Sequence, residues 1–224
     1  MFDFHTHILP DIDDGSKSVE ESLAMLSMLK EQGADGIAAT PHFYAQQRTP
    51  AQFFAERQAA FERLKPHLPP DAPAIRLGAE VLYFEGIGRF DGLKDFCLEG
   101  TDLLLLEMPF GVWTTRTVST VLELSKRSDV TVVLAHIDRY LHRQNKKAIR
   151  LLLDCGVLAQ ANTVFFTKNR RRALKMLRDG HIHFLGTDCH NTTTRKPDLA
   201  PALAAIDRKG LERPSLKKGE GDAV

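Results

Sequence analysis

Histidine and carboxylate side chains recur along the chain in types and spacings that suit divalent metal ions. Imidazole and carboxylate together suit zinc, manganese or iron. His5 and His7 are two residues apart, so on an extended segment both rings point to the same side, as two ligands of one ion require. The donors outnumber what one ion can use, which predicts a site for two or three ions. The candidates are His5, His7, Asp13, Asp14, His42, Glu80, Glu107, His136, Asp188 and His190.

Each candidate stands at or just past the end of a short apolar run that predicts a buried strand. Helical patterns fill most of the gaps. The clearest begins at Ser18, a typical N-cap with acidic residues in the next turn, and a second opens with Thr49-Pro50. The seven predicted strands lie near Phe2–Phe4, Gly36–Thr40, Ala74–Ala79, Asp102–Leu106, Val130–Ala135, Val157–Ala161 and Ile182–Gly186.

Repeated alternation of strand and helix predicts an α/β fold with parallel strands and helical crossovers. A closed β/α barrel of seven units fits the length of the chain, and a doubly wound open sheet is the competing architecture. In a barrel the carboxyl ends of the strands form one face, where active sites are built. Ligand-type residues remote in sequence are therefore expected to converge on that face.

A structural role competes with ligation at every one of these positions. A lone His-x-His is often a loop, and a carboxylate at a strand end often caps a helix or forms a salt bridge. Taken together, the coincidence of so many polar residues at strand ends favours a metal site. The remaining histidines are interpreted as ordinary surface or structural residues: His67, His142, His181 and His183.

Composition limits the classes of partner. The 224 residues carry 30 basic and 29 acidic side chains, a net charge of +1, which argues against a general electrostatic grip on nucleic acid or anionic membrane. Three widely spaced cysteines indicate a reducing compartment, and the cytoplasm is expected. The first residues lack the pattern of a signal peptide, and no apolar run is long enough to span a membrane.

As a set, the motifs resemble the PHP (polymerase and histidinol phosphatase) superfamily. Its bacterial tyrosine-protein phosphatase branch, the CpsB/CapC/YwqE group, is the most similar, from residue 2 to about residue 200. The motifs that carry the resemblance are Asp3-Phe4-His5-Thr6-His7, Asp13-Asp14-Gly15, Thr40-Pro41-His42, Gly78-Ala79-Glu80, Leu106-Glu107, Ala135-His136-Ile137-Asp138-Arg139-Tyr140 and Thr187-Asp188-Cys189-His190-Asn191.

The resemblance implies a distorted seven-stranded β/α barrel of the PHP type, similar to a TIM barrel, with three metal ions. Manganese is the metal expected, with iron or zinc as alternatives. Two arginines, Arg139 and Arg195, match the phosphate-binding arginines of this branch. The implied ligand sets are His5, His7, Glu80 and Asp188 for the first ion, Glu80, Glu107 and His136 for the second, and Asp14, His42 and His190 for the third.

The resemblance also implies an activity and a partner. The expected enzyme is a metal-dependent protein-tyrosine phosphatase acting on the phosphotyrosine tail of a bacterial tyrosine kinase, linked to capsular or exopolysaccharide biosynthesis. A PHP-type small-molecule phosphoesterase, such as a histidinol phosphatase, is the alternative, and a metal-free accessory module is a third. One phosphatase domain over residues 1–210 and a polar tail over 211–224 are expected. The oligomeric state stays open.

Three other features have two interpretations each. Cys189 and Arg195 have the Cys-x5-Arg spacing of thiol-based phosphatases, but the segment lacks a glycine for a phosphate loop, so Cys189 is predicted not to be a nucleophile. Basic residues around 139–150 and 168–178 are solvated helix faces or a docking surface for an anionic partner. Four aromatic residues either line the site or cover the barrel: Phe43, Tyr44, Phe110 and Trp113.

Overall fold

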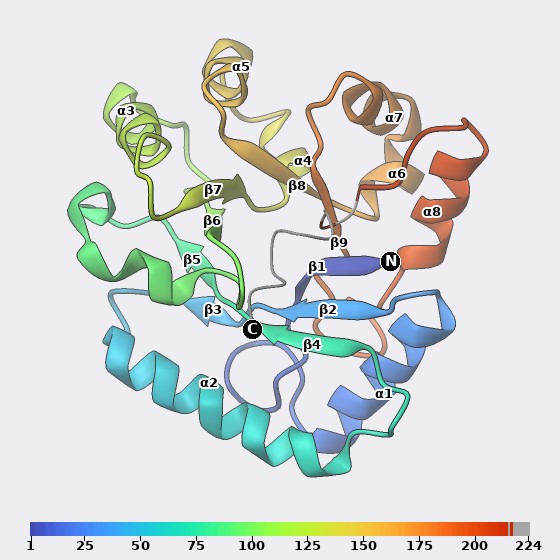
Figure 1. Ribbon diagram of the computed structural model, residues 1–224. Helices are drawn as coiled ribbons and strands as arrows, with labels where there is room; N and C mark the ends of the chain where they lie inside the picture. Colours follow the sequence, from blue (N-terminus) through green and yellow to red (C-terminus); the bar gives the residue numbers. More distant parts are fainter. Residues whose placement is uncertain (215, 217–224) are drawn as a thin grey trace.

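Parallel strands in the centre of the molecule are surrounded by helices (Figure 1). The computed structural model of the protein describes residues 1–214 and 216. The strands are β1 (Phe2–Thr6), β2 (Gly36–Ala39), β3 (His42–Phe43), β4 (Ala74–Leu77), β5 (Glu80–Leu82), β6 (Leu103–Glu107), β7 (Thr131–Leu134), β8 (Leu158–Asn162) and β9 (Phe184–Gly186).

Helices follow the strands and cover their outer side. The α-helices are α1 (Val19–Glu31), α2 (Pro50–Leu64), α3 (Thr115–Leu124), α4 (Ile137–Tyr140), α5 (Lys146–Asp154), α6 (Phe165–Lys168), α7 (Arg170–Arg178) and α8 (Leu199–Asp207). Three short 3₁₀ segments complete the described elements: η1 (Lys65–His67), η2 (Ile87–Arg89) and η3 (Asp91–Phe96).

The strands form two parallel sheets rather than one uninterrupted set of seven. One sheet has the order β1-β2-β4, and the other, a curled half-barrel, has the order β3-β5-β6-β7-β8-β9. Two predicted strands are each divided, into β2 and β3 and into β4 and β5. Pro41 stands at the first break and has no amide hydrogen to donate to a ladder. The second break, at Gly78 and Ala79, lies beside it, since Gly78 N–H donates to Ala39 O.

Backbone hydrogen bonds also connect the first and last strand regions. His7 N–H donates to Cys189 O at 3.0 Å, and Asp188 N–H donates to His5 O at 2.8 Å. Asp3 adds side-chain bonds, because its carboxylate accepts from the amide and the hydroxyl of Thr187. The segment that follows β9 is thereby held against β1, and residues from the two ends of the chain share one site.

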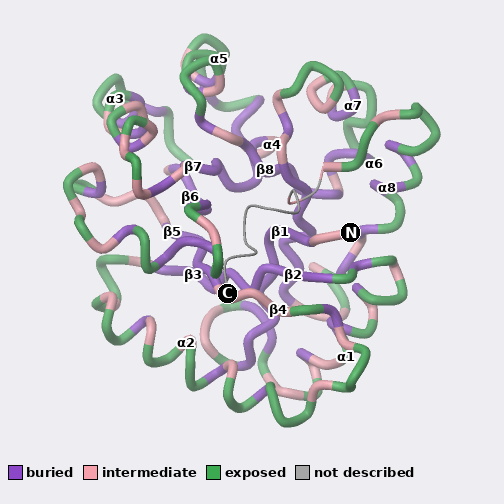
Figure 2. The backbone as a smooth tube through the Cα atoms, in the orientation of Figure 1, coloured by how far each residue is buried: buried purple, intermediate pink, exposed green. Residues whose placement is uncertain are grey.

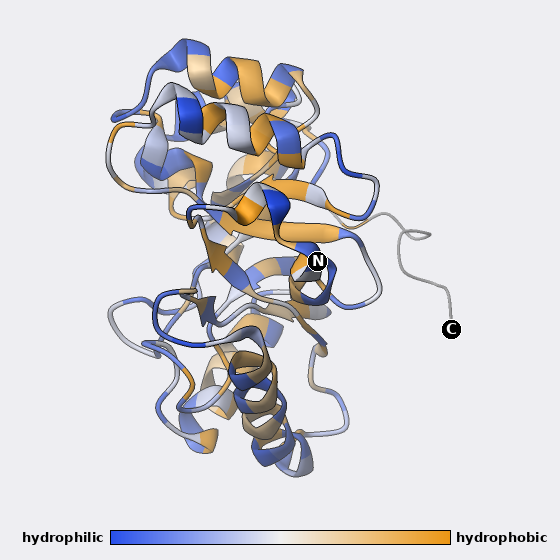
Figure 3. Cartoon of the chain, turned by 90° about the vertical axis from the view of Figure 1, so that its left-hand side faces the viewer, coloured by the Kyte–Doolittle hydropathy of each residue, from blue (hydrophilic) through white to orange (hydrophobic). Residues whose placement is uncertain are grey.

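Successive residues of the strands enter two separate apolar clusters. Leu104 and Leu106 of β6 lie in the larger cluster, which the helices cover, whereas Leu103 and Leu105 lie in a smaller one. Because strand side chains alternate, the smaller cluster occupies the concave face of the curled sheet. Its centre is the stacked pair Phe4 and Phe184, with ring centroids 4.2 Å apart. Figure 2 shows the buried residues concentrated around the strands, and Figure 3 shows the apolar strands crossing the molecule.

Local sequence signals explain where several helices begin. The Ser18 hydroxyl accepts from Glu21 N–H at the start of α1, and Thr49 forms a capping box with Gln52 at the start of α2, as predicted. The helix α3 begins at Thr115. The reason is the Thr114 side chain, which caps α3 by accepting from Thr117 N–H.

Two expectations concern the ends and the surface. In the part of the chain that the structure describes, no helix is both long and apolar enough to cross a membrane. The predicted polar tail covers residues 211–224, of which 215 and 217–224 lie outside the described residues.

Candidate metal centre

The nine residues that the motif match assigned to metal ions form one connected cluster. Seven lie near the carboxyl end of a strand or after it, whereas His42 and Glu80 begin the short strands β3 and β5. Glu80, the first residue of β5, lies at the centre of the cluster. Its Oε2 atom is 3.1 Å from His5 Nε2, 3.3 Å from His7 Nε2 and 3.0 Å from His42 Nδ1. Its Oε1 atom lies 2.9 Å from His136 Nε2. One buried carboxylate thus faces four imidazoles that come from three strand regions, β1, β3 and β7.

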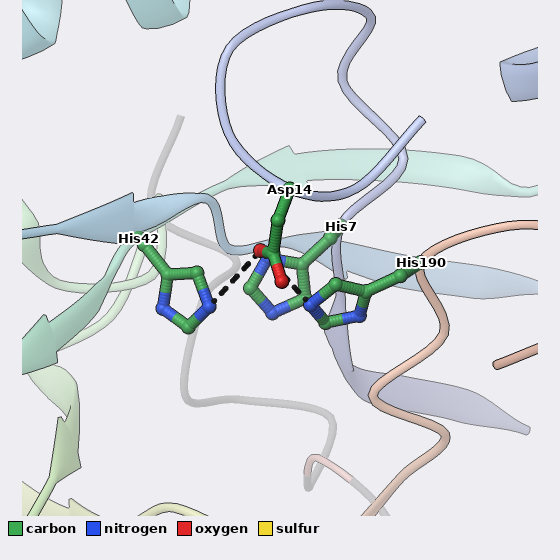
Figure 4. Close-up of side chains that lie close together, drawn as sticks. All are labelled: His7, Asp14, His42 and His190. Carbon is green, nitrogen blue, oxygen red and sulfur yellow. Dashed lines mark ion pairs between the residues drawn. The ribbon is translucent and has the colours of Figure 1, made fainter. Parts of the chain in front are cut away.

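A second carboxylate gathers the imidazoles on the other side of the cluster. Asp14 Oδ1 lies 3.4 Å from His42 Nε2 and 3.3 Å from His190 Nε2. The His7 ring lies beside them, with its centroid 3.9 Å from that of His190. Figure 4 shows these four side chains directed toward a common point. Their donor atoms are mutually close enough to hold one ion.

Glu107 and Asp188 complete the cluster. Glu107 Oε1, at the end of β6, is 3.4 Å from His136 Nε2. Asp188 Oδ1 is 3.7 Å from His5 Nε2 and 3.6 Å from His7 Nε2. The groups of mutually close donors overlap the sets implied by the motifs without being identical. They are His7, Asp14, His42 and His190; His5, His7 and Glu80; and His42, Glu80 and Glu107.

The chemistry of the donor set fits divalent cations. Among the described residues, five buried side-chain nitrogen or oxygen atoms lack a hydrogen-bond partner, and four of them belong to this cluster. Buried polar atoms are nearly always satisfied, so an orphaned group calls for an explanation, and a bound ion is one. The four atoms are His42 Nδ1, Glu80 Oε2, His136 Nδ1 and His190 Nε2.

Electrostatics in the cluster favour positive charge. Burial opposes protonation of His42, but the neighbouring carboxylates of Asp14 and Glu80 raise its pKa to about 11. Burial likewise opposes protonation of His136, but hydrogen bonds to Glu107 and Glu80 raise its pKa to about 9. His190 differs, because burial and the neighbouring His7 lower its pKa to about 3. The carboxylates thus hold protons on nearby imidazoles, and cations that bind there release those protons.

The backbone is strained at two of the nine positions. His136 has φ 32° and Asp188 has φ 53°, both in the left-handed region that non-glycine residues rarely adopt. Within the described residues, the only other non-glycine residue with positive φ is Asp11. Such strain persists where surrounding structure imposes it and clusters at functional sites. The strained turns after β7 and β9 place both side chains in the centre.

Asp13 orients one of the imidazoles, a role that sequence reasoning did not assign. Asp13 Oδ2 lies 2.8 Å from His7 Nδ1, and it also accepts from the backbone N–H of His42 at 3.0 Å. A proton on His7 Nδ1 leaves Nε2 free to face the centre. The turn needs Gly15, because a Cβ there would lie 2.3 Å from His7 O. The Asp13-Asp14-Gly15 motif, which is one of those that carry the resemblance to the PHP superfamily, contained the signal for this orienting role of Asp13.

Two amides on β8 orient further members of the cluster and were missed. Gln160 Oε1 accepts from His136 N–H at 2.6 Å and lies 3.3 Å from His5 Nδ1. Gln160 Nε2 donates to Asn162 Oδ1, and Asn162 Nδ2 donates to Asp188 Oδ2 at 3.1 Å. This buried chain joins three of the nine residues. Apart from their burial within a strand, nothing in the sequence marks the two amides as special.

Both predicted arginines border the cluster and pair with its carboxylates. Arg139 Nη2 donates to Asp188 Oδ2. Arg195 Nη2 donates to Asp188 Oδ1 at 2.8 Å, and its Nη1 lies 3.5 Å from Asp14 Oδ2. Both guanidinium groups are partly exposed, so they present cationic donors to whatever enters from solvent.

A cleft of about 430 Å³ opens over the cluster. Its polar lining includes Asp14, Glu107 and both arginines. The four aromatic residues left open by the sequence divide into two kinds. Phe43 and Trp113 are buried in the core, whereas Tyr44 and Phe110 line the cleft. Further residues that border the cleft are His42, Gln46, Gln47 and Leu82.

Cys189 has the surroundings of a structural residue. Its side chain is fully buried in the larger apolar cluster, and burial raises the pKa of its thiol well above the ordinary value. A nucleophilic cysteine needs a lowered pKa and access to substrate. The prediction that Cys189 is not a nucleophile agrees with this environment.

Comparison with known proteins adds independent evidence. The sequence profile of a family described as "Capsular polysaccharide synthesis, CpsB/CapC" matches residues 1–215. The tyrosine-protein phosphatase CpsB of Streptococcus pneumoniae is 30% identical, and the match covers 93% of this chain and 90% of that protein. The tyrosine-protein phosphatase YwqE of Bacillus subtilis is 28% identical over 96% of this chain and 88% of its own length.

A solved structure gives the same result for the fold. A structure from a study of YwqE from Bacillus subtilis and CpsB from Streptococcus pneumoniae, described as unique metal-dependent tyrosine phosphatases, superposes with a TM-score of 0.78 and 25% identity. The match covers 93% of this chain and 87% of that one. By sequence profile, sequence identity and structure, the chain belongs to the CpsB/CapC family.

Proposed function

We propose that the protein is a metal-dependent protein-tyrosine phosphatase. The observation that carries the proposal is one connected cluster of nine ligand-type side chains with a cleft over it that both arginines line. The names of the relatives from Streptococcus pneumoniae and Bacillus subtilis, both tyrosine-protein phosphatases, support it. Membership of the CpsB/CapC family supports a link to capsular or exopolysaccharide synthesis.

The nine residues are proposed to hold three divalent ions, with manganese expected and iron or zinc as alternatives. Glu80 is the residue best placed to be shared, because its two oxygens face imidazoles on different sides. Divalent ions bound there supply Lewis-acid stabilisation of phosphoryl oxygens and a water of lowered pKa as the attacking group. Asp13 and Gln160 hold His7 and His5 so that Nε2 of each ring faces the centre.

Arg139 and Arg195 are proposed to clamp the phosphoryl group. Their planar donor forks match phosphate oxygens, and both border the cleft beside Asp188. The leaving group of phosphotyrosine is a phenolate, whose parent pKa is about 10. It needs less help from a proton donor than an alkoxide does. A site rich in cationic groups, without a dedicated general acid, can therefore act on phosphotyrosine.

The test pairs catalysis with metal content. Wild-type protein, His136→Ala and the control His67→Ala are assayed with phosphotyrosine peptide, phosphoserine peptide and histidinol phosphate, and bound metals are quantified. His67 is exposed on η1, outside the cluster. We expect the wild type and His67→Ala to hydrolyse the phosphotyrosine peptide and His136→Ala to lose both metal and activity. An active, metal-loaded His136→Ala would overturn the site, and preference for histidinol phosphate would overturn the substrate.

Three structural proposals accompany the function. The interrupted strands are proposed to serve as seven positions of a distorted, closed β/α barrel, supported by the hydrogen bonds between β1 and the segment after β9. Residues 1–210 are proposed to form one phosphatase domain, followed by the polar tail. The cytoplasm is the proposed compartment, supported by three cysteines that form no disulfide.

The proposed partner is the phosphotyrosine tail of a bacterial tyrosine kinase. Exposed basic residues of α7 support an anionic partner, because Arg170, Arg171, Lys175 and Arg178 line a cavity of about 510 Å³ together with Lys209. Reversing two charges, Arg170→Glu with Arg171→Glu, should weaken hydrolysis of an acidic phosphotyrosine peptide and spare phenyl phosphate. The matched control is Lys94→Glu with Lys126→Glu, two exposed lysines on other elements. Equal rates for both double variants would contradict docking on α7.

A further inference from the structure

The loop between β6 and α3 holds apolar side chains in solvent at the edge of the cleft. Phe110 is 50% exposed and Val112 is 78% exposed, whereas Met108 and Trp113 on either side are buried. Leaving the Phe110 ring exposed forgoes the free energy that its burial would contribute. Its position beside a polar, ligand-rich cleft suggests that it serves a function.

Hydrogen bonds from α4 and the segment after it fix the shape of this loop. The Tyr140 hydroxyl accepts from Met108 N–H at 2.9 Å and donates to Met108 O at 3.2 Å. Gln144 accepts from Trp113 N–H and donates to Gly111 O, both at 2.8 Å. Two buried polar side chains thereby pin both ends of the loop. The exposure of Phe110 is imposed by this framework and does not result from fraying.

The ring of Phe110 faces one of the imidazoles of the metal centre. It lies nearly parallel to the His136 imidazole, at an interplanar angle of 10° and a centroid distance of 6.5 Å. Tyr44, which follows β3, lines the same cleft and stacks on His42 at 5.0 Å with an interplanar angle of 20°. Two aromatic rings from different segments therefore border the cleft that Asp14, Glu107 and both arginines also line.

We propose that Phe110, together with Tyr44, binds the aromatic ring of the substrate and makes the enzyme selective for aryl over alkyl phosphates. The inference rests on the proposed phosphatase function and deepens it. When Arg139 and Arg195 hold the phosphoryl group, the ester group of the substrate lies in the cleft beside the apolar side chains that line it. A tyrosine ring gains offset or edge contacts with Phe110 there, and a serine side chain is too short to do so.

The measurement is the ratio of kcat/KM for a phosphotyrosine peptide to kcat/KM for a phosphoserine peptide of the same flanking sequence. In Phe110→Ala we expect this ratio to fall about two- to tenfold, the size of one lost aromatic contact. Phe110→Tyr keeps a ring and should restore the ratio. Leu151→Ala, which removes an exposed apolar side chain from α5 (46% exposed), is the matched control and should leave it unchanged. Bound metal is measured in each variant.

A binding measurement separates recognition from turnover. The competitive inhibition constants of phenylphosphonate and methylphosphonate are compared, and Phe110→Ala should weaken only the first. A wild type inactive on both peptides overturns the proposed function. A wild type active on phosphotyrosine, with an unchanged ratio and unchanged phenylphosphonate inhibition in Phe110→Ala, overturns the role of Phe110 alone. Equal losses on both peptides, with metal lost, would assign Phe110 to the support of His136 instead.

Discussion

The amino-terminal and carboxyl-terminal ends of the same strands differ in almost every physical respect. At the amino-terminal end, aromatic and aliphatic side chains fill the concave face around the Phe4–Phe184 stack. Just past the carboxyl ends, buried imidazoles and carboxylates face one another. Four strand regions contribute to both ends, with Phe4 and His5 from β1, Leu105 and Glu107 from β6, Val133 and His136 from β7, and Phe184 and Asp188 from β9.

The apolar end stabilises the fold, whereas the polar end destabilises it. Burying apolar surface contributes about 25 cal/mol per Å². At the polar end, orphaned donor and acceptor atoms and left-handed backbone at His136 and Asp188 each cost free energy. The apolar end thus supports an arrangement of the ligand residues that those residues would not adopt on their own. Substitutions at the polar end should therefore chiefly lower activity, and substitutions at the apolar end should chiefly lower stability.

The largest effect is expected for Glu80→Gln at the polar end. The substitution keeps the shape of the side chain and removes the charge shared among four imidazoles. Loss of several kcal/mol of charge stabilisation lowers kcat/KM by about 10³-fold or more. A Glu80→Gln variant with full metal content and the kcat/KM of the wild type would contradict the role of this carboxylate.

Phe184→Ala should show the reverse profile. The side chain stacks on Phe4 in the smaller apolar cluster, and its loss should lower the free energy of unfolding by about 3–5 kcal/mol. Phe184→Leu keeps most of the volume and should cost less. Denaturant unfolding measures the stability, and kcat/KM per folded molecule measures the site. If Phe184→Ala loses activity only in proportion to the fraction of molecules that are folded, the apolar end serves stability alone. A fall in kcat/KM per folded molecule would contradict that role.

A smaller effect is expected where the two ends meet, at Gln160 of β8. Gln160→Leu removes the acceptor that faces His5 Nδ1 and the N–H of His136. Loss of such an orienting partner typically weakens metal binding by about 10- to 100-fold, which equilibrium metal titration can measure. Gln160→Glu keeps an acceptor oxygen and should bind metal more tightly than Gln160→Leu. Equal metal affinity in wild type and Gln160→Leu would mean that the amide serves packing only.

Sequence reasoning found the side chains that cluster at the polar end because their signal lies in residue type and position. Their role as metal ligands stays a prediction. Histidines and carboxylates just after apolar runs are rare by chance, and the topology of parallel strands brings such positions together. The supporting amides Gln160 and Asn162 carried no such signal. An amide within a strand is ordinary until the structure shows that its neighbours are His5 and Asp188.

The aromatic residues show where pattern alone fails. Phe43 and Tyr44 are adjacent, yet the first packs in the core and the second lines the cleft. Successive strand residues point to opposite sides, so a shift of one position reverses the assignment. The division of two predicted strands had a visible cause in Pro41, but the matching break at Gly78 depends on its neighbour in space. Both the direction of a side chain and the position of a strand break depend on how neighbouring strands are aligned, and short strands specify that alignment weakly.

The smallest effect is expected at Cys189, between two members of the metal centre. If the thiol were the nucleophile, its spacing from Arg195 would be the decisive feature and Cys189→Ser would abolish turnover. The side chain is instead fully buried among apolar residues, and burial raises the pKa of the thiol well above its ordinary value. We expect Cys189→Ser and Cys189→Ala to keep most of the wild-type kcat/KM, and native Cys189 to resist alkylation while exposed Cys155 reacts. Inactive variants with full metal content would assign the chemistry to the Cys189 thiol instead of to the residues at the strand ends.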